Sequence, residues 1–481
     1  MHAIHSKDRR GCEMTGLKAM LNPKVTAVVG VSTSNPFSPG NVIFRKLAFE
    51  NGLPTYPINP KGGTVEGIDV HKSITEAPDD IELVVISVAA KYVPGVLTEC
   101  GEKKIRSVIV VSGGFSEVGD MGATLQSEIV EIANRYKISM VGPNCIGVFV
   151  PEVLDTFFLP SERVARPRKG KVAIISQSGG WLIERLEEFA ARHVGIAAAI
   201  SIGNAAQTNV TDFVEHFGRD DNIDVILAYI EGFGGEEGRD FVDACKKIVP
   251  KKPVIVFKGG ESEAGHRATQ SHTSSLAGDQ AVSKAAFNQY GIIQAVDEDE
   301  VMAYSKVFSF KPKPMLGPRV GTLTVSGGHG VIASDEASHY GLIMPPFNKG
   351  QQEAMREVMT PAYQGIASFR NPCDLTGSAS DVDYEQVLDK MLGFETIDAA
   401  LLLLLPYAPG ISLQIGARVA NVAKRYMKTV IAYVPNLDKY EVIMRGFELN
   451  GIVVGDTIEE AVQMLNGIRT RSKFLQRIGI L

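Results

Sequence analysis

The sequence predicts an α/β protein with parallel sheets, and its length suggests about three domains. Two observations carry this prediction. Short runs of β-branched and other apolar residues alternate with helical patterns along the 481 residues, and near-continuously apolar strands are typical of parallel sheets covered by helices on both faces. Two polar, proline-rich stretches, 160–170 and 311–318, interrupt the alternation. Because such stretches are typical of linkers, we expect domains over residues 15–160, 170–310 and 318–481.

The predicted strands are short apolar runs rich in Val and Ile, bounded by turn residues or by helical patterns. In the first domain these runs are expected to form one sheet, and in each later domain another. They span 25–31, 54–59, 82–88, 107–112, 171–176, 224–231, 253–257, 319–326, 399–406 and 429–434.

Composition and charge argue against several classes of protein. The chain carries a net charge of −6 and no stripe of Lys or Arg, which disfavours a nucleic-acid partner. Its longest apolar run, 399–405, is too short to cross a membrane. The first residues are polar and lack the apolar core of a secretory signal, and either Met1 or Met14 is the start. Five scattered cysteines without a CxxC pair favour the reducing cytoplasm over a disulfide framework or a zinc site.

The second and third domains are predicted to be copies of each other. Four segments match in the same order, and the first copy is longer by about sixteen residues between the last two matches. Because loops inserted between duplicated elements often carry function, this extra stretch, 258–279, is a candidate functional loop. The matched pairs are 171–180 with 319–328, 223–230 with 397–404, 253–257 with 429–433 and 287–293 with 447–453.

The first domain begins like a nucleotide-binding fold. A strand runs into a turn at Gly30 and a helix follows, as in the first unit of a Rossmann fold, but the remaining glycines of the G-x-G-x-x-G motif are missing. Lys61 follows the second strand, where a NAD site needs an acidic residue. A lysine suits a phosphate instead, so a NAD-dependent dehydrogenase is disfavoured. Residues at the carboxyl edge of this sheet either bind a ligand or form ordinary turns. They are Gly30, Ser32, Lys61, Ser87, Val88, Ser112 and Gly113.

A phosphate site is predicted in the second domain. The segment SQSGG follows a buried strand and precedes a helix, and free N–H groups at a helix N-terminus bind anions. The copy at 326–328 has the same shape, so the motif either binds phosphate or is how this fold turns. The candidate phosphate-binding residues are Ser176, Ser178, Gly179 and Gly180.

His272 is the candidate catalytic residue, since it lies on the stretch that the third domain lacks. A lone histidine is more often structural than catalytic. However, Glu231 ends a strand at the same edge of the same domain, and a carboxylate there can accept the imidazole N–H and leave the other nitrogen nucleophilic. His329, which follows a Gly-Gly turn in the third domain, is the second candidate.

These motifs resemble the NDP-forming (ADP-forming) acyl-CoA synthetases, relatives of succinyl-CoA synthetase. The segments SQSGG, YIEGF and 258–279 occur in that order, and VGPNCIGV at 141–148 is similar to the family's coenzyme A signature. The resemblance runs from about Leu17 to the C-terminus and follows the alpha subunit. It implies a Rossmann-like CoA-binding domain followed by two flavodoxin-like, succinyl-CoA synthetase-like domains.

The resemblance also implies an acid–thiol ligase of the acetate–CoA ligase type. Acyl-CoA, ADP and phosphate would give a carboxylic acid, CoA and ATP, reversibly, through an acyl phosphate and a phosphohistidine. Acetyl-CoA or another small acyl-CoA is the expected substrate. By the same resemblance His272 is phosphorylated, Glu231 orients it, and Ser178 and Gly179 hold the phosphate. Coenzyme A is expected at Gly30, Ser32, Lys61, Ser112 and Gly113, with Asn144 and Cys145 near the thioester.

The family's nucleotide module, an ATP-grasp domain, has no counterpart in the sequence pattern. The resemblance therefore implies a separate beta subunit that binds ATP or ADP with Mg²⁺, in an α2β2 heterotetramer, while this chain itself binds no metal. The alternative is a non-catalytic CoA-binding or regulatory protein with the same fold, although the presence of both Glu231 and His272 argues against it.

Overall fold

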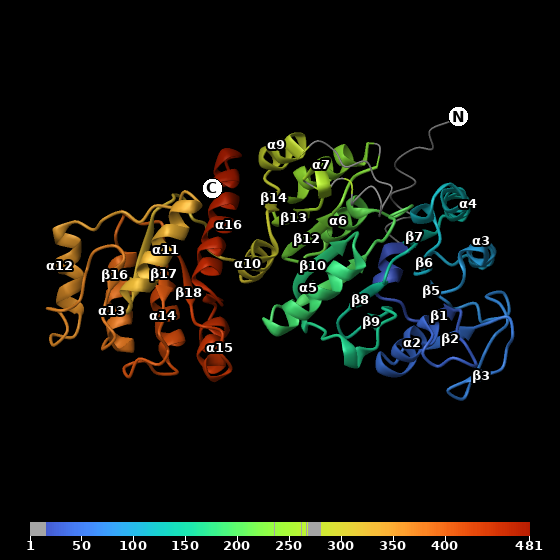
Figure 1. The fold of residues 1–481 in the computed structure, drawn as a ribbon, viewed down its shortest axis with the longest axis horizontal. Coiled ribbons are helices and arrows are strands. Elements are labelled where there is room, and N and C mark those ends of the chain that lie inside the picture. Colours follow the sequence, from blue (N-terminus) through green and yellow to red (C-terminus); the bar gives the residue numbers. More distant parts are fainter. Residues whose placement is uncertain (1–15, 235, 261, 266, 268–279) are drawn as a thin grey trace. The chain divides into compact units, whose positions relative to one another are not determined.

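The structure is a computed structural model that describes residues 16–234, 236–260, 262–265, 267 and 280–481 (Figure 1). The chain forms two compact units, one ending at Gln294 and the other spanning Ala295–Leu481. Three large sheets in the described residues have the same order of parallel strands, 2-1-3-4-5 when the strands of each are counted along the chain. This order confirms the predicted parallel α/β class and places a topological switch point between the first and third strands of each sheet.

The first sheet has the order β2-β1-β5-β6-β7, and all its strands are parallel. Buried side chains of α3 and α4 pack on one face of it, while α2 contacts β1. A short hairpin of β3 (Thr64–Val65) and β4 (Ile68–Asp69) follows β2. The main elements are β1 (Thr26–Val29), α2 (Pro39–Arg45), a π-helical turn (Lys46–Glu50), β2 (Thr55–Ile58), β5 (Leu83–Ile86), α3 (Val93–Glu102), β6 (Ser107–Val110), α4 (Asp120–Tyr136) and β7 (Ser139–Val141).

The second sheet belongs to the same unit and has the order β14-β13-β12-β10-β11-β8-β9. Its last two strands, β8 (Val148–Val150) and β9 (Leu154–Asp155), are antiparallel additions next to β11. They precede the proline-rich stretch at 160–170. The other elements are β10 (Lys169–Ser176), α5 (Gly179–Ala191), β11 (Ile196–Ser201), α6 (Val210–Arg219), β12 (Val225–Ile230), α7 (Glu237–Ile248), β13 (Val254–Lys258), α9 (Gln280–Tyr290) and β14 (Ile293–Ala295).

The third sheet forms the core of the second unit, with the order β16-β15-β17-β18-β19. Helices α12 to α15 pack on one another and bury an apolar core against the sheet, and α16 packs on α10 and α11. The elements are α10 (Glu298–Ser309), β15 (Val320–Thr324), α11 (Gly327–His339), α12 (Lys349–Val358), β16 (Cys373–Asp374), α13 (Asp381–Leu392), β17 (Ala399–Leu403), α14 (Ile415–Ala423), β18 (Thr429–Tyr433), α15 (Glu441–Leu449), β19 (Val453–Gly455) and α16 (Ile458–Arg477).

The predicted strands all overlap observed ones, because each contains a run of mainly buried residues. The second and third sheets also share the strand order that the internal duplication predicts. Even a local detail recurs: the Ser176 hydroxyl donates to the carbonyl of Ser178, and the Thr324 hydroxyl donates to the carbonyl of Ser326. Among the described residues, no helix is both long and apolar enough to cross a bilayer.

Candidate active site

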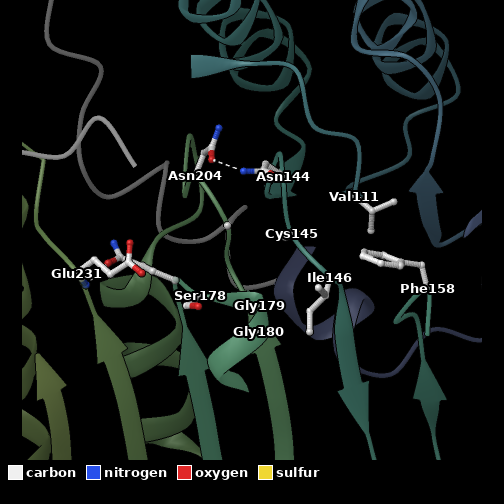
Figure 2. A pocket seen from close by; sticks show the side chains of 12 residues that line it. Val111, Asn144, Cys145, Ile146, Phe158, Ser178, Gly179, Gly180, Asn204 and Glu231 are labelled. Atoms are coloured by element: carbon white, nitrogen blue, oxygen red, sulfur yellow. Dashed lines mark hydrogen bonds between the residues drawn. The ribbon is translucent and has the colours of Figure 1, made fainter. Parts of the chain in front are cut away.

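A cavity of about 320 Å³ lies in the first unit, where the loops after β6 and β7 meet the carboxyl ends of β10, β11 and β12. Six of the predicted site residues line it: Asn144, Cys145, Ser178, Gly179, Gly180 and Glu231. In Figure 2, Ser178 and Glu231 lie on one side of the cavity and Val111 and Phe158 on the other. The remaining lining residues are Ile146, Gln177, Gly203 and Asn204.

The start of α5, where the sequence predicts a phosphate site, forms one side of this cavity. Ser178 is the N-cap of the helix, and its hydroxyl oxygen accepts the N–H of Trp181 at 3.4 Å. This leaves the hydroxyl proton of Ser178 and the first N–H groups of the helix to face an anion. A Cβ on Gly180 would meet nothing within 4 Å, so a ligand can approach the backbone there. Ser176 is fully buried and supports the turn rather than lining the cavity.

Gln177 joins the anion side to the carboxylate of Glu231. Its side-chain oxygen accepts the N–H of Glu231 at 2.5 Å and the N–H of Gly232 at 3.3 Å, and its amide nitrogen donates to the carbonyl of Gly232 at 3.0 Å. The loop after β12 is therefore held beside the helix start. The sequence analysis included Gln177 in the SQSGG motif but gave its side chain no role. The available signal was a long side chain with an amide group in a turn that is predicted to bind phosphate.

Glu231 lies directly after β12, and Gly259 lies beside it after the neighbouring strand β13. A Cβ on Gly259 would lie 3.6 Å from Cγ of Glu231 and 2.8 Å from the Tyr229 hydroxyl oxygen. The stretch that carries His272 therefore leaves the sheet next to Glu231. His272 itself lies outside the described residues.

A polar network closes the cavity between the two sheets. Asn144, which has a left-handed φ of 58°, donates from its amide to Oδ1 of Asn204 at 3.3 Å (Figure 2). Asn204 in turn donates to Oε2 of Glu117 at 2.6 Å. Burial raises the pKa of Glu117, but hydrogen bonds from Asn204 and from the N–H groups of Gly114 and Phe115 outweigh it, so the net pKa is lowered. Asn204 and Glu117 were missed by sequence reasoning, because their contact crosses 87 residues of chain.

Cys145 lines the cavity as a protonated thiol. Its side chain is 4% exposed and donates to the carbonyl of Val110 at 3.4 Å. Burial raises the pKa of this thiol to about 12. Since only the thiolate is strongly nucleophilic, Cys145 is a packing residue of the cavity and not a nucleophile.

The other predicted ligand-binding residues lie along the carboxyl edge of the first sheet and do not line the cavity. Gly30 has a φ of 103°, and a Cβ there would lie 2.1 Å from the carbonyl oxygen of Ser87, so only glycine fits. The hydroxyl of Ser32 accepts N–H groups of its own loop, and that of Ser112 accepts the N–H of Val88 at 3.1 Å. Lys61 is exposed.

Gly113 completes this edge, directly after Ser112. A Cβ on Gly113 would lie 3.3 Å from Oδ1 of Asn144 and 3.3 Å from Oε1 of Glu117. The sheet edge therefore runs up to the polar network that borders the cavity. Within the described ranges, no cluster of three or more His, Cys, Asp or Glu side chains is arranged to hold a metal ion.

The matching turn in the second unit lacks the polar partners of the first. Val325 occupies the position of Gln177, and Leu405 occupies that of Glu231. His329 packs edge-on against Tyr433, and burial lowers the pKa of its imidazole. The second unit therefore has an apolar residue, Leu405, at the strand end that corresponds to Glu231.

Comparisons with known proteins bear on both domains of the first unit. A family model described as a CoA binding domain matches residues 24–151, and one described as a succinyl-CoA ligase like flavodoxin domain matches residues 169–308. The alpha subunit of acetate–CoA ligase (ADP-forming) I from Pyrococcus furiosus is 35% identical over 469 residues, which cover 95% of this chain and 98% of that subunit. The chain belongs to the family of ADP-forming acyl-CoA synthetase alpha subunits. This confirms the family resemblance and the predicted order of fold types.

Other members of the ADP-forming acyl-CoA synthetase family show how the chain relates to longer proteins. It is 36% identical to acetate–CoA ligase (ADP-forming) I of Archaeoglobus fulgidus, covering 82% of this chain but 55% of that protein. The chain thus spans about half the length of some curated relatives that it matches. A solved structure of an acetyl-coenzyme A synthetase from Ca. Korarchaeum cryptofilum, in complex with phosphate and ADP, superposes with a TM-score of 0.83 at 29% identity, covering 97% of this chain and all of that one.

Proposed function

We propose that this chain is the alpha subunit of an acid–thiol ligase that converts acyl-CoA, ADP and phosphate into a carboxylic acid, CoA and ATP, reversibly. The observation that carries the proposal is that the anion-binding start of α5 and the Glu231 carboxylate share one cavity, beside the strand from which the His272 stretch departs. The relatives named above act on acetate or acetyl-CoA, so acetyl-CoA or another small acyl-CoA is the proposed substrate. Of the three proposed domains, 15–160 binds CoA, 170–310 carries the chemistry and 318–481 is the second ligase-like domain.

The first step joins phosphate to the acyl group. Phosphate sits against the first N–H groups of α5 and the hydroxyl of Ser178, and one of its oxygens attacks the thioester carbonyl. A carbon–oxygen bond forms and the carbon–sulfur bond breaks, so that the thiolate leaves and takes up a proton. The helix dipole and the backbone donors stabilise the negative charge throughout.

The second step moves the phosphoryl group to His272. An imidazole nitrogen attacks the phosphorus, a nitrogen–phosphorus bond forms, and the bond to the acyl oxygen breaks to release the carboxylate. The carboxylate of Glu231 accepts a hydrogen bond from the N–H of the ring, which fixes the tautomer and keeps the other nitrogen nucleophilic. The phosphoryl group then passes from His272 to an oxygen of ADP. Phosphoryl transfer of this kind depends mainly on positioning and charge neutralisation.

Coenzyme A fits the carboxyl edge of the first sheet. Lys61 offers an exposed ammonium for a phosphate, and Gly30 lets the chain turn closely past Ser87. From this edge the thiol end reaches the cavity at Asn144 and Cys145. Ser32, Val88, Ser112 and Gly113 shape the same edge and complete the proposed CoA contacts.

The nucleotide is proposed to bind on a separate ATP-grasp beta subunit within an α2β2 assembly. A separate partner is supported by the Pyrococcus furiosus relative, which is named as an alpha subunit and is matched over 98% of its length. Mg²⁺ on that subunit would neutralise the phosphates of ADP. We propose the cytoplasm as the location, since the four cysteines in the described residues are buried and unbridged, as is typical of a reducing compartment.

The test is phosphorylation of His272. The complex with the partner subunit is incubated with ATP labelled in the γ-phosphate, and the label on this chain is measured. His272→Ala should abolish it, while the control His339→Ala, in the other unit, should retain it. Label that survives in His272→Ala would overturn the role of His272. A wild type that shows neither label nor turnover would favour the non-catalytic alternative.

A further inference from the structure

We infer that Val111, Ile146 and Phe158 form the wall that receives the acyl group, and that this wall selects a compact, apolar carboxylic acid without a charged or hydroxylated end. The inference rests on the proposed function and deepens it by naming the substrate class. All three residues line the same cavity as the anion-binding helix start. Ile146 lies within the VGPNCIGV segment, but the sequence analysis gave none of these three side chains a role.

The position of the acyl group follows from that of the phosphate. In an acyl phosphate the acyl carbon is bonded to a phosphate oxygen, so it occupies the cavity space next to the start of α5. The apolar wall begins at that point, because a Cβ on Gly179 would lie 2.8 Å from Cγ2 of Ile146. Figure 2 shows Val111 and Phe158 further along, on the side away from Glu231 and Ser178. The acyl chain therefore extends from the anion side toward these side chains.

The chemistry of the wall sets the kind of acid. Val111, Ile146 and Phe158 offer no hydrogen-bonding side-chain atom, and the nearby thiol of Cys145 already donates to the Val110 carbonyl. A hydroxyl or carboxylate placed against these three side chains would lose its water and gain no hydrogen bond from them, which is unfavourable. The cavity of about 320 Å³ must also hold the phosphate and the thiol. A short apolar chain satisfies both limits.

Phe158 is held in place by a buried ionic cluster. Asp155 accepts the N–H of Phe157 at 2.9 Å, and Lys46 donates from Nζ to the carbonyl of Leu159 at 3.0 Å, so both neighbours of Phe158 are fixed. Lys46 and Asp155 are themselves paired at 2.9 Å and are 1% and 5% exposed. This segment lies between the regions matched by the two family models, 24–151 and 169–308. Because the backbone on both sides of Phe158 is fixed, its ring is positioned to act as a stop for the acyl chain.

The test compares acids in the complex of this chain with its partner subunit. CoA-dependent ADP formation from ATP is measured with acetate, phenylacetate and succinate for the wild type, Phe158→Ala and the milder Phe158→Leu. The control is Phe49→Ala, which makes the same truncation at a ring that is 55% exposed and outside the cavity. Thermal unfolding of each variant shows that it is folded.

We expect the wild type to prefer acetate over succinate. In Phe158→Ala the ratio of kcat/KM for phenylacetate to that for acetate should rise by about tenfold to a hundredfold, as for other changes of fit in apolar pockets. Phe158→Leu should fall between, and Phe49→Ala should match the wild type. A ratio that stays constant in both Phe158 variants while acetate is still used, or a wild type that prefers succinate, would overturn this inference alone. A wild type that forms no ADP with any acid would overturn the proposed function itself.

Discussion

Replacing Asp155 with Asn tests whether the buried cluster beside the cavity is as important for stability as its geometry indicates. Asp155 receives Nζ of Lys46 at 2.9 Å and Nε of Arg166 at 3.0 Å. Its side chain is 7% exposed and that of Lys46 is 2% exposed, so water screens the pair little. Asparagine has nearly the same shape and keeps an oxygen for the N–H of Phe157. The substitution removes the charge and also places an amide donor where Oδ2 accepts Nε of Arg166.

The expected loss follows from leaving an ammonium buried without its carboxylate. Removing one partner of a buried ion pair typically costs about 3–5 kcal/mol of unfolding free energy, and we expect Asp155→Asn to fall in that range at pH 7. Burial already lowers the pKa of Lys46, against the opposing effect of Asp155. Without the carboxylate this pKa falls further. Because the folded protein then holds the proton less tightly than the unfolded chain, the loss of stability should shrink as the pH rises toward the ordinary pKa of lysine.

Urea unfolding followed by tryptophan fluorescence measures this effect directly. Trp181 is the single tryptophan and stacks on Tyr229 at 4.7 Å, so its signal reports on the first unit. The control is Asp79→Asn, which breaks an ion pair whose carboxylate is 95% exposed and should leave the transition close to that of the wild type. A loss below about 1 kcal/mol in Asp155→Asn, or a loss that does not change between pH 7 and pH 9.5, would refute the reasoning.

Two further predictions concern the cavity. Ser178→Ala should raise the KM for phosphate about tenfold to a hundredfold, because a hydrogen bond to a charged group contributes about 1.5–3 kcal/mol. The control Ser326→Ala, in the matching turn of the second unit, should leave steady-state kinetics unchanged. Equal effects of the two substitutions would contradict an anion site at α5. The carboxylate of Glu117 should stabilise the fold above its usual pKa near 4.5 and cease to do so as the pH falls through its lowered pKa. The difference in unfolding free energy between the wild type and Glu117→Gln should therefore be larger at pH 7 than at pH 3, and a difference that is the same at both values would argue against the network.

Much of the fold was predictable because the signals were local. Most of the run at 25–31 and all of the run at 399–406 are buried in the structure, and such strands stay recognisable without knowledge of their neighbours. The strands β8 and β9 were not predicted, because they have only three and two residues. Strand β8 pairs antiparallel with β11, and β9 pairs antiparallel with β8, so each is defined by its partner and not by its own pattern. Their position nevertheless decides where Phe158 lies.

Parts of the site could be predicted only where all the residues involved lie close together in the sequence. The turn at Ser178 and Gly179 could be placed because a strand, a small-residue turn and a helix follow one another in sequence. The contacts of Gln177 with Glu231, and of Asn204 with Glu117, join residues 54 and 87 positions apart. Pairs of this kind leave no periodic trace in a single sequence.

The central claim is that the first half of the reaction takes place on this chain and ends on His272. Its most direct test is to incubate the complex of this chain and its partner subunit with acetyl-CoA and labelled phosphate, without nucleotide, and to measure free CoA and label together. We expect one equivalent of CoA for each labelled chain, with the label on His272 and released on adding ADP. Release of CoA that requires ADP, or label that appears on another residue, would contradict the account.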